Sequence, residues 1–227
     1  MRMGTPTRFL FALVYVFALS LISVDTAVAA SKSYDVALES QPCDIVTADM
    51  IATTYQVPVK QLKQSEPVES LCAYEMTGNG RILNVKVSVA VFDINKSAED
   101  AFISSTRSMT AQEMAEKLNE FGIEFDEEDR QFARELGLPD PQPTGVQFED
   151  VKGIADQARF QTDEGVLHVQ HGNLLMKLDA FYGPSMKKPD TLTLAALEEA
   201  TSRWKQDSID ERREQSTALA KAALDAL

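Results

Sequence analysis

The chain has 227 residues, of which 44% are hydrophobic and 25% are charged. Its 35 acidic and 22 basic side chains give a formal net charge of −13. This acidity argues against nucleic acids and anionic lipid surfaces as partners, because like charges repel. The length is enough for one ordinary domain with an appendage.

The first thirty residues have the three parts of a secretory signal peptide. Two arginines flank the start of an uncharged apolar run from Phe9 to Val24, and the small residues of 27–30 form an A-x-A-like cleavage site. The run is shorter than the about 20 residues that a membrane span needs. We therefore expect cleavage after Ala29 or Ala30 and a periplasmic or secreted protein. Cleavage would change the net charge from −13 to −14, whereas an uncleaved leader would act as a short membrane anchor.

The chain contains two cysteines, Cys43 and Cys72. In an exported protein an even pair predicts a disulfide, and the chain-entropy model assigns a loop of this size about 3.5 kcal/mol of stabilisation. A redox or metal pair is disfavoured, because the two residues lack C-x-x-C spacing. The residues before Cys43 do not form a lipobox, so we expect no lipid anchor there.

Hydrophobic spacing predicts a helix and two strands in the first part of the domain. Strict alternation over Leu83–Val91 is typical of a half-buried strand and favours an antiparallel sheet. The elements expected before it are a helix capped by Thr47, a loop over 60–70, and a strand over 71–76 followed by a glycine-containing turn at 77–80.

Three helices are expected next. Capping-box patterns open the first at Ser97 and the second at Thr110, and the third is expected over 127–136. The first helix is expected to end near Met109.

Strand patterns resume after the insertion, followed by helix. The expected strands are 151–154, 158–162, 166–170 and 174–182. Asp190 is expected to cap a closing helix that reaches Trp204. The tail 205–227 is charged at first and then rich in alanine and leucine, with a narrow apolar stripe that includes Leu219 and Ala223. This tail helix is expected to dock on the domain, to pair with a partner, or to fray.

Together these elements predict an α+β fold in a single domain over 31–204, with the helical insertion 110–143 and a C-terminal helix over 205–227. We expect an antiparallel sheet of about five strands packed by helices.

The order of these motifs resembles a group of small exported sensor-like domains of unknown function, related to the PsbP-like α/β/α sandwich. The resemblance rests on a cysteine at the start of a short helix that ends at Val57-Pro58-Val59, a second cysteine that opens the strand Cys72-Ala73-Tyr74-Glu75, the stretch Val151–Ala158, a hairpin and a final helix. It covers Cys43 to about Trp204, with a large helical insertion over 110–143, and this chain departs from the lipoprotein members in lacking a lipobox. The resemblance implies binding of ligands or partners rather than catalysis.

His168 and His171 are the two histidines of the chain and its candidate metal ligands, with Asp163 or Glu164 nearby. Residues three apart on a strand point to opposite faces, so the pair converges only if the turn begins at His171. An ordinary strand histidine and an ordinary turn histidine explain the same residues.

Motifs for nucleophilic or nucleotide chemistry are missing from the sequence, which has no G-x-S-x-G, no P-loop and no G-x-G-x-x-G. The aromatic residues of the later strands either fill the core or line an apolar pocket for a small amphiphile. These residues are Phe148, Phe160, Phe181 and Tyr182.

We therefore expect a non-catalytic exported binding or accessory protein without a cofactor, whose partner is an unknown protein or a small amphiphilic ligand. Two alternatives stay open. One is a hydrolase that uses carboxylates or a metal near His168 and His171. The other is an oligomerisation or protein-interaction module built on the C-terminal helix.

Overall fold

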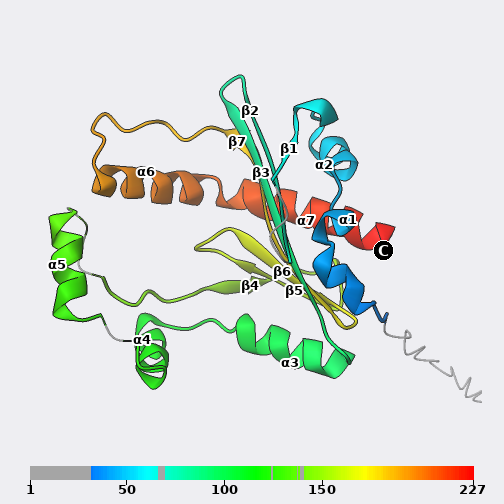
Figure 1. The fold of residues 1–227 in the computed structure, drawn as a ribbon, viewed down its shortest axis with the longest axis horizontal. Coiled ribbons are helices and arrows are strands. Elements are labelled where there is room, and N and C mark those ends of the chain that lie inside the picture. The colour runs from blue at the N-terminus through cyan, green and yellow to red at the C-terminus, as the bar shows by residue number, and fades with distance from the viewer. Residues whose placement is uncertain (1–31, 66–69, 124, 137, 139–140) are drawn as a thin grey trace, which may run out of the picture. The chain divides into compact units, whose positions relative to one another are not determined.

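A computed structural model describes residues 32–65, 70–123, 125–136, 138 and 141–227, and the predicted leader lies outside these described residues. The described chain forms an α+β fold around one seven-stranded antiparallel sheet with the order β1-β2-β3-β7-β6-β5-β4 (Figure 1). The strands are β1 (Lys63–Gln64), β2 (Leu71–Gly78), β3 (Arg81–Val91), β4 (Phe148–Asp150), β5 (Gln157–Gln161), β6 (Val166–His171) and β7 (Leu174–Pro184).

The sheet has more strands than the expected five, because a short strand lies at each edge. The expected loop over 60–70 contains β1, which is polar and therefore shows no hydrophobic alternation. At the other edge β4 lies at Phe148–Asp150, while the expected strand 151–154 has an irregular backbone. Both edge strands are mostly exposed, so the alternation that identifies half-buried strands is missing from their sequences.

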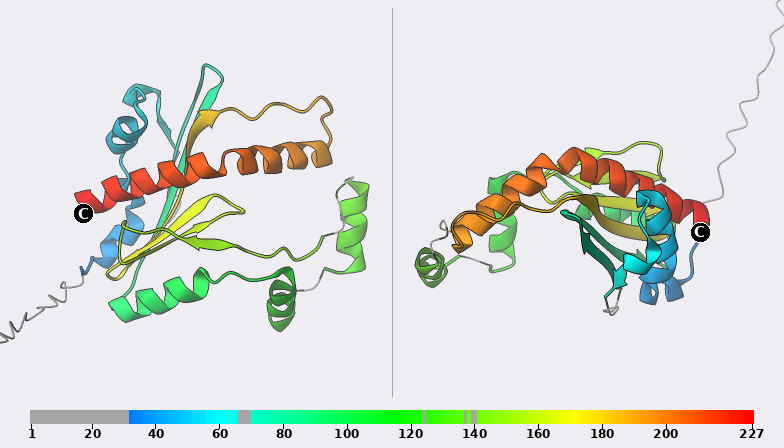
Figure 2. Two further views of the ribbon diagram at one scale, coloured as in Figure 1. Left: turned by 180° about the vertical axis from the view of Figure 1, so that it is seen from behind. Right: turned by 90° about the horizontal axis from the view of Figure 1, so that it is seen from above.

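The helices connect and cover this sheet. They are η1 (Val36–Ser40), α1 (Pro42–Ile45), α2 (Ala48–Tyr55), η2 (Val59–Gln61), α3 (Asn95–Ser105), α4 (Ala111–Glu120), α5 (Glu127–Glu135), α6 (Leu194–Asp207) and α7 (Ile209–Ala226). In Figures 1 and 2, α4 and α5 lie beyond the ends of the strands, and α7 crosses the sheet.

Several helix starts confirm the expected caps, and two do not. Thr47 caps α2, and Thr110 opens α4 with a complete capping box. The capping box at Ser97 was a wrong prediction, because α3 already begins at Asn95. That helix ends before Met109, whose backbone instead pairs with Val146 in an isolated antiparallel bridge.

The closing helix also begins later than expected. Its cap is Thr193, whose hydroxyl accepts a hydrogen bond from the amide of Ala196 at 3.2 Å, so Asp190 is not the cap. The helix continues through Trp204 and breaks at Ser208, where α7 begins.

The main core lies between one face of the sheet and the helices α2 and α7. The alternating residues of β3 supply its centre, as the sequence predicts. In α7, Leu219 and Ala223 of the predicted stripe are fully buried, so the C-terminal helix docks on its own domain.

The structure joins Cys43 and Cys72 in a disulfide, with their Cα atoms 5.3 Å apart. Cys72 lies on β2 with no exposed surface, and Cys43 lies in α1. The bond therefore ties the first helices to the sheet.

We expect the double variant Cys43→Ala/Cys72→Ala to lose about 3 kcal/mol of unfolding free energy, because the unfolded chain regains the freedom that the cross-link removes. Urea unfolding of the oxidised protein and the variant measures this loss. The reduced natural protein is the control for the small volume that alanine removes. A midpoint that reduction leaves unchanged would contradict a stabilising role for the bond.

Candidate functional site

The candidate site is a groove between α6 and the segment that leaves β7. It has a volume of about 670 Å³, within the range of sites that hold small ligands. The groove is lined by residues 184–190 on one side, by Ala196, Glu199, Ala200, Arg203, Trp204 and Asp207 of α6, and by Ser208 and Glu211 at the start of α7.

Two contacts hold the segment beside the helix. The indole Nε1 of Trp204 donates a hydrogen bond to the carbonyl oxygen of Pro184 at 3.0 Å, and the hydroxyl of Thr201 lies 3.4 Å from the sulfur of Met186. Since the later residue of α6 meets the earlier residue of the segment, the two run in opposite directions, as Figure 1 shows.

The ring of Phe181 packs against the ring of Trp204. The two rings meet edge to face, with centroids 5.1 Å apart, a favoured geometry for aromatic pairs. Phe181 is fully buried, and a Cβ at Gly183 would lie 2.3 Å from its ring. Glycine at 183 is therefore required for the ring to lie over the strand and support the groove wall.

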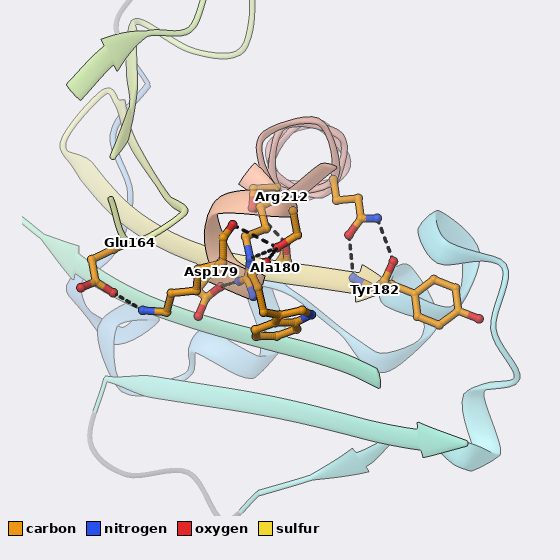
Figure 3. Close-up of polar contacts among 10 residues, drawn as sticks. Glu164, Asp179, Ala180, Tyr182 and Arg212 are labelled. Carbon is orange, nitrogen blue, oxygen red and sulfur yellow. Dashed lines mark hydrogen bonds and ion pairs between the residues drawn. The ribbon is translucent and has the colours of Figure 1, made fainter. Parts of the chain in front are cut away.

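The guanidinium of Arg212 packs against both rings, 4.5 Å from the centre of Phe181 and 4.7 Å from that of Trp204. Its Nη1 atom lies 3.2 Å from a carboxylate oxygen of Asp179 on β7 (Figure 3). Its Nε atom donates to the hydroxyl of Ser208 at 3.0 Å, and this hydroxyl donates to the carbonyl of Trp204. Arg212 thus joins β7 to the break between α6 and α7.

Burial disfavours the charged forms of both Arg212 and Asp179. Only 5% of the Arg212 side chain and 27% of the Asp179 side chain is exposed. Burial raises the pKa of Asp179 despite the attraction of Arg212, and burial lowers the pKa of Arg212. The guanidinium nevertheless stays protonated, as arginine does in proteins. The pair therefore acts as a structural ion pair behind the groove.

The two ends of the groove carry different charges. Asp207 and Glu211 are exposed at the end near Pro184, and Lys187 and Lys188 are exposed toward the other end. None of these four side chains forms an ion pair within the described ranges. On α6 between these ends, Arg203 pairs with Glu199.

The structure places His168 and His171 on opposite faces of β6. His168 lies beside Lys177 of the neighbouring strand β7. His171 lies beside Leu174 of β7, on the face of the sheet that forms the main core. His171 still belongs to the strand, so the turn that would bring the two rings together begins after it. In the described part of the chain, no three His, Cys, Asp or Glu side chains gather as metal ligands.

The two histidines have different surroundings. His168 is 7% exposed, its Nε2 atom has no hydrogen-bond partner among the described residues, and its ring meets Phe148 edge to face at 5.3 Å. Burial, with a smaller effect of Lys177, lowers its pKa to about 4. The Nδ1 atom of His171 lies 3.6 Å from a carboxylate oxygen of Asp156.

The four aromatic residues that the sequence suggested for an apolar pocket do not gather in one. Phe160 and Phe181 are fully buried on opposite faces of the sheet. Phe148 lines a separate hollow beside Arg159, and the ring of Tyr182 lies 4.3 Å from the guanidinium carbon of Arg81. The groove was not predicted from the sequence, although Phe181 and the single tryptophan, Trp204, are evident there.

Comparisons with protein family models, curated proteins and solved structures found no match for this chain. What the chain does must therefore follow from its own geometry.

We expect Arg212→Met to lower the unfolding free energy by about 3 kcal/mol, because it leaves the carboxylate of Asp179 without its partner. Urea unfolding measures this loss. Arg203→Met is the control, because the Arg203–Glu199 pair is exposed and such pairs contribute little. Equal losses in the two variants would contradict a stabilising role for the buried pair.

The stability of the protein is expected to fall as the pH falls through the range of His168. The folded state holds the pKa of His168 near 4, below its ordinary value of 6.5. The unfolded chain therefore binds the proton first. The contribution of neutral His168 is complete above pH about 6.5 and is lost by pH about 4, for a total of about 3 kcal/mol.

His168→Gln tests this expectation, with His171→Gln as the matched control. The free energy of unfolding in urea is measured at several pH values between these limits. We expect His168→Gln to lose less stability on acidification than the natural chain, and less than His171→Gln. The same pH slope in all three proteins would place the sensitivity elsewhere.

Proposed function

We propose that this chain is a non-catalytic exported binding protein, and that it binds its ligand in the groove between α6 and residues 184–190. The main support for this proposal is that the wall of the groove is held in place by contacts within the protein. Its tryptophan wall is held by Pro184, Phe181 and Arg212, so the site is formed before any ligand arrives. A preformed wall reduces the ordering cost of binding.

The disulfide bond of the chain supports export. The bond between Cys43 and Cys72 is typical of oxidising compartments. The leader expected over 1–30 would deliver the protein there. In the described ranges, no helix has both the length and the apolar character needed to cross a bilayer.

The hydrolase alternative has less support from the geometry. A shared metal or acid–base site needs its groups within reach of one reacting atom, and His168 and His171 face away from each other across the sheet. The interaction module built on the C-terminal helix also has less support, because Leu219, Ala223 and Leu224 of α7 pack into the domain core.

Ligand retention tests the proposal. We expect the full chain, isolated from its native envelope under mild conditions, to carry a small bound molecule that native mass spectrometry detects. Ala200→Phe fills the groove with a ring and should abolish retention. Ala218→Phe places the same ring on an exposed position of α7 and should leave retention unchanged.

Two outcomes would reject the groove as the binding site. One is the absence of a bound molecule from the natural chain. The other is equal retention by Ala200→Phe and Ala218→Phe.

A further inference from the structure

The distribution of charge along the groove limits what it can hold. Asp207 and Glu211 lie at one end, and Lys187 and Lys188 lie toward the other, where Asp190 offsets part of the positive charge. The wall between them contains Met186, Ala200 and Trp204, together with the paired Arg203 and Glu199. A ligand that satisfies this pattern has a positive group at one end, a negative group at the other, and an apolar body between them.

This pattern separates ligand classes. A fatty acid has one charged end, so it would leave the acidic end of the groove without a partner. A zwitterionic lipid has both charges adjacent in its head group, which does not match charges on either side of an apolar centre. A short peptide of apolar residues has an amino group and a carboxylate at opposite ends of an apolar body.

The spacing of charged groups along α6 sets the length of the peptide. Glu199 and Asp207 are eight residues apart on α6, which corresponds to about 12 Å along a helix. An extended chain covers this distance in about four residues, at about 3.3 Å per residue. The lining segment 184–190 lies alongside the helix and runs in the opposite direction.

We infer that the groove binds a short apolar peptide with free termini, with the amino group near Asp207 and Glu211 and the carboxylate near Lys187 and Lys188. Arg203 is paired with Glu199, so the net positive charge near the carboxylate comes from Lys187 and Lys188, and Asp190 offsets part of it. This inference rests on the groove being the binding site proposed above, and it specifies the ligand class.

Trp204 provides the measurement, because it is the one tryptophan of the chain and it lies in the groove wall. The full chain is titrated with the tetrapeptide Ala-Leu-Leu-Ala while its intrinsic fluorescence is recorded. The same titration uses the N-acetylated form, the C-amidated form, and dodecanoate as a single-ended amphiphile. We expect saturable binding of the free tetrapeptide, and affinity about threefold to fivefold lower for each blocked end.

Charge-reversal variants assign the two ends. Lys187→Glu/Lys188→Glu should weaken the free peptide and leave the amidated peptide unchanged. Asp207→Lys/Glu211→Lys should weaken the free peptide and leave the acetylated peptide unchanged. Lys221→Glu, on an exposed position of α7, is the control and should alter neither.

The outcomes separate this inference from the proposed function. Binding of dodecanoate without binding of the peptide, or equal binding of free and doubly blocked peptides, would overturn the peptide assignment and leave the groove as a binding site. Binding of neither probe, together with natural-ligand retention that Ala200→Phe does not alter, would overturn both.

Discussion

The buried contact between Arg212 and Asp179 connects the sheet to the last two helices. A single guanidinium contacts a carboxylate on β7, the rings of Phe181 and Trp204, and the hydroxyl at the break between the last two helices. The turn between β5 and β6 lies close as well, since a Cβ at Gly165 would come within 2.8 Å of the arginine stem. One side chain therefore fixes the path of the chain from the sheet to both helices.

The strands β6 and β7 have unequal lengths, and helix α7 covers the part of β7 that β6 leaves unpaired. β6 begins opposite Asp179, so β7 continues to Pro184 with one edge lacking a strand. Helix α7 covers that edge with side chains. The amide of Gln215 accepts from the backbone N–H of Tyr182 at 2.6 Å and donates to its carbonyl at 2.9 Å, and the hydroxyl of Ser216 lies near the carbonyl of Ala180 (Figure 3). Pairing this edge with side chains protects it from joining other chains.

The sequence predicted the parts of this fold that have local causes. The alternation in β3, the caps at Thr47 and Thr110, and the pairing of the two cysteines all depend on residues close in sequence or on compartment. The edge strands and the break at Ser208 could not be predicted in this way, because distant partners form them. Nor could the burial of Arg212, which lies in a run of charged residues and looks solvent-exposed in sequence. The groove depends on that burial, so its position was also beyond sequence reasoning.

The hydrogen bond between the backbone N–H of Tyr182 and the side chain of Gln215 gives the most direct test of this arrangement. Amide hydrogen exchange of the native protein measures it at a single residue. We predict that this amide exchanges as slowly as the central amides of β3, because it is released only when α7 leaves the sheet. Rapid exchange at Tyr182, beside slow exchange in β3, would show that α7 does not close the edge of β7.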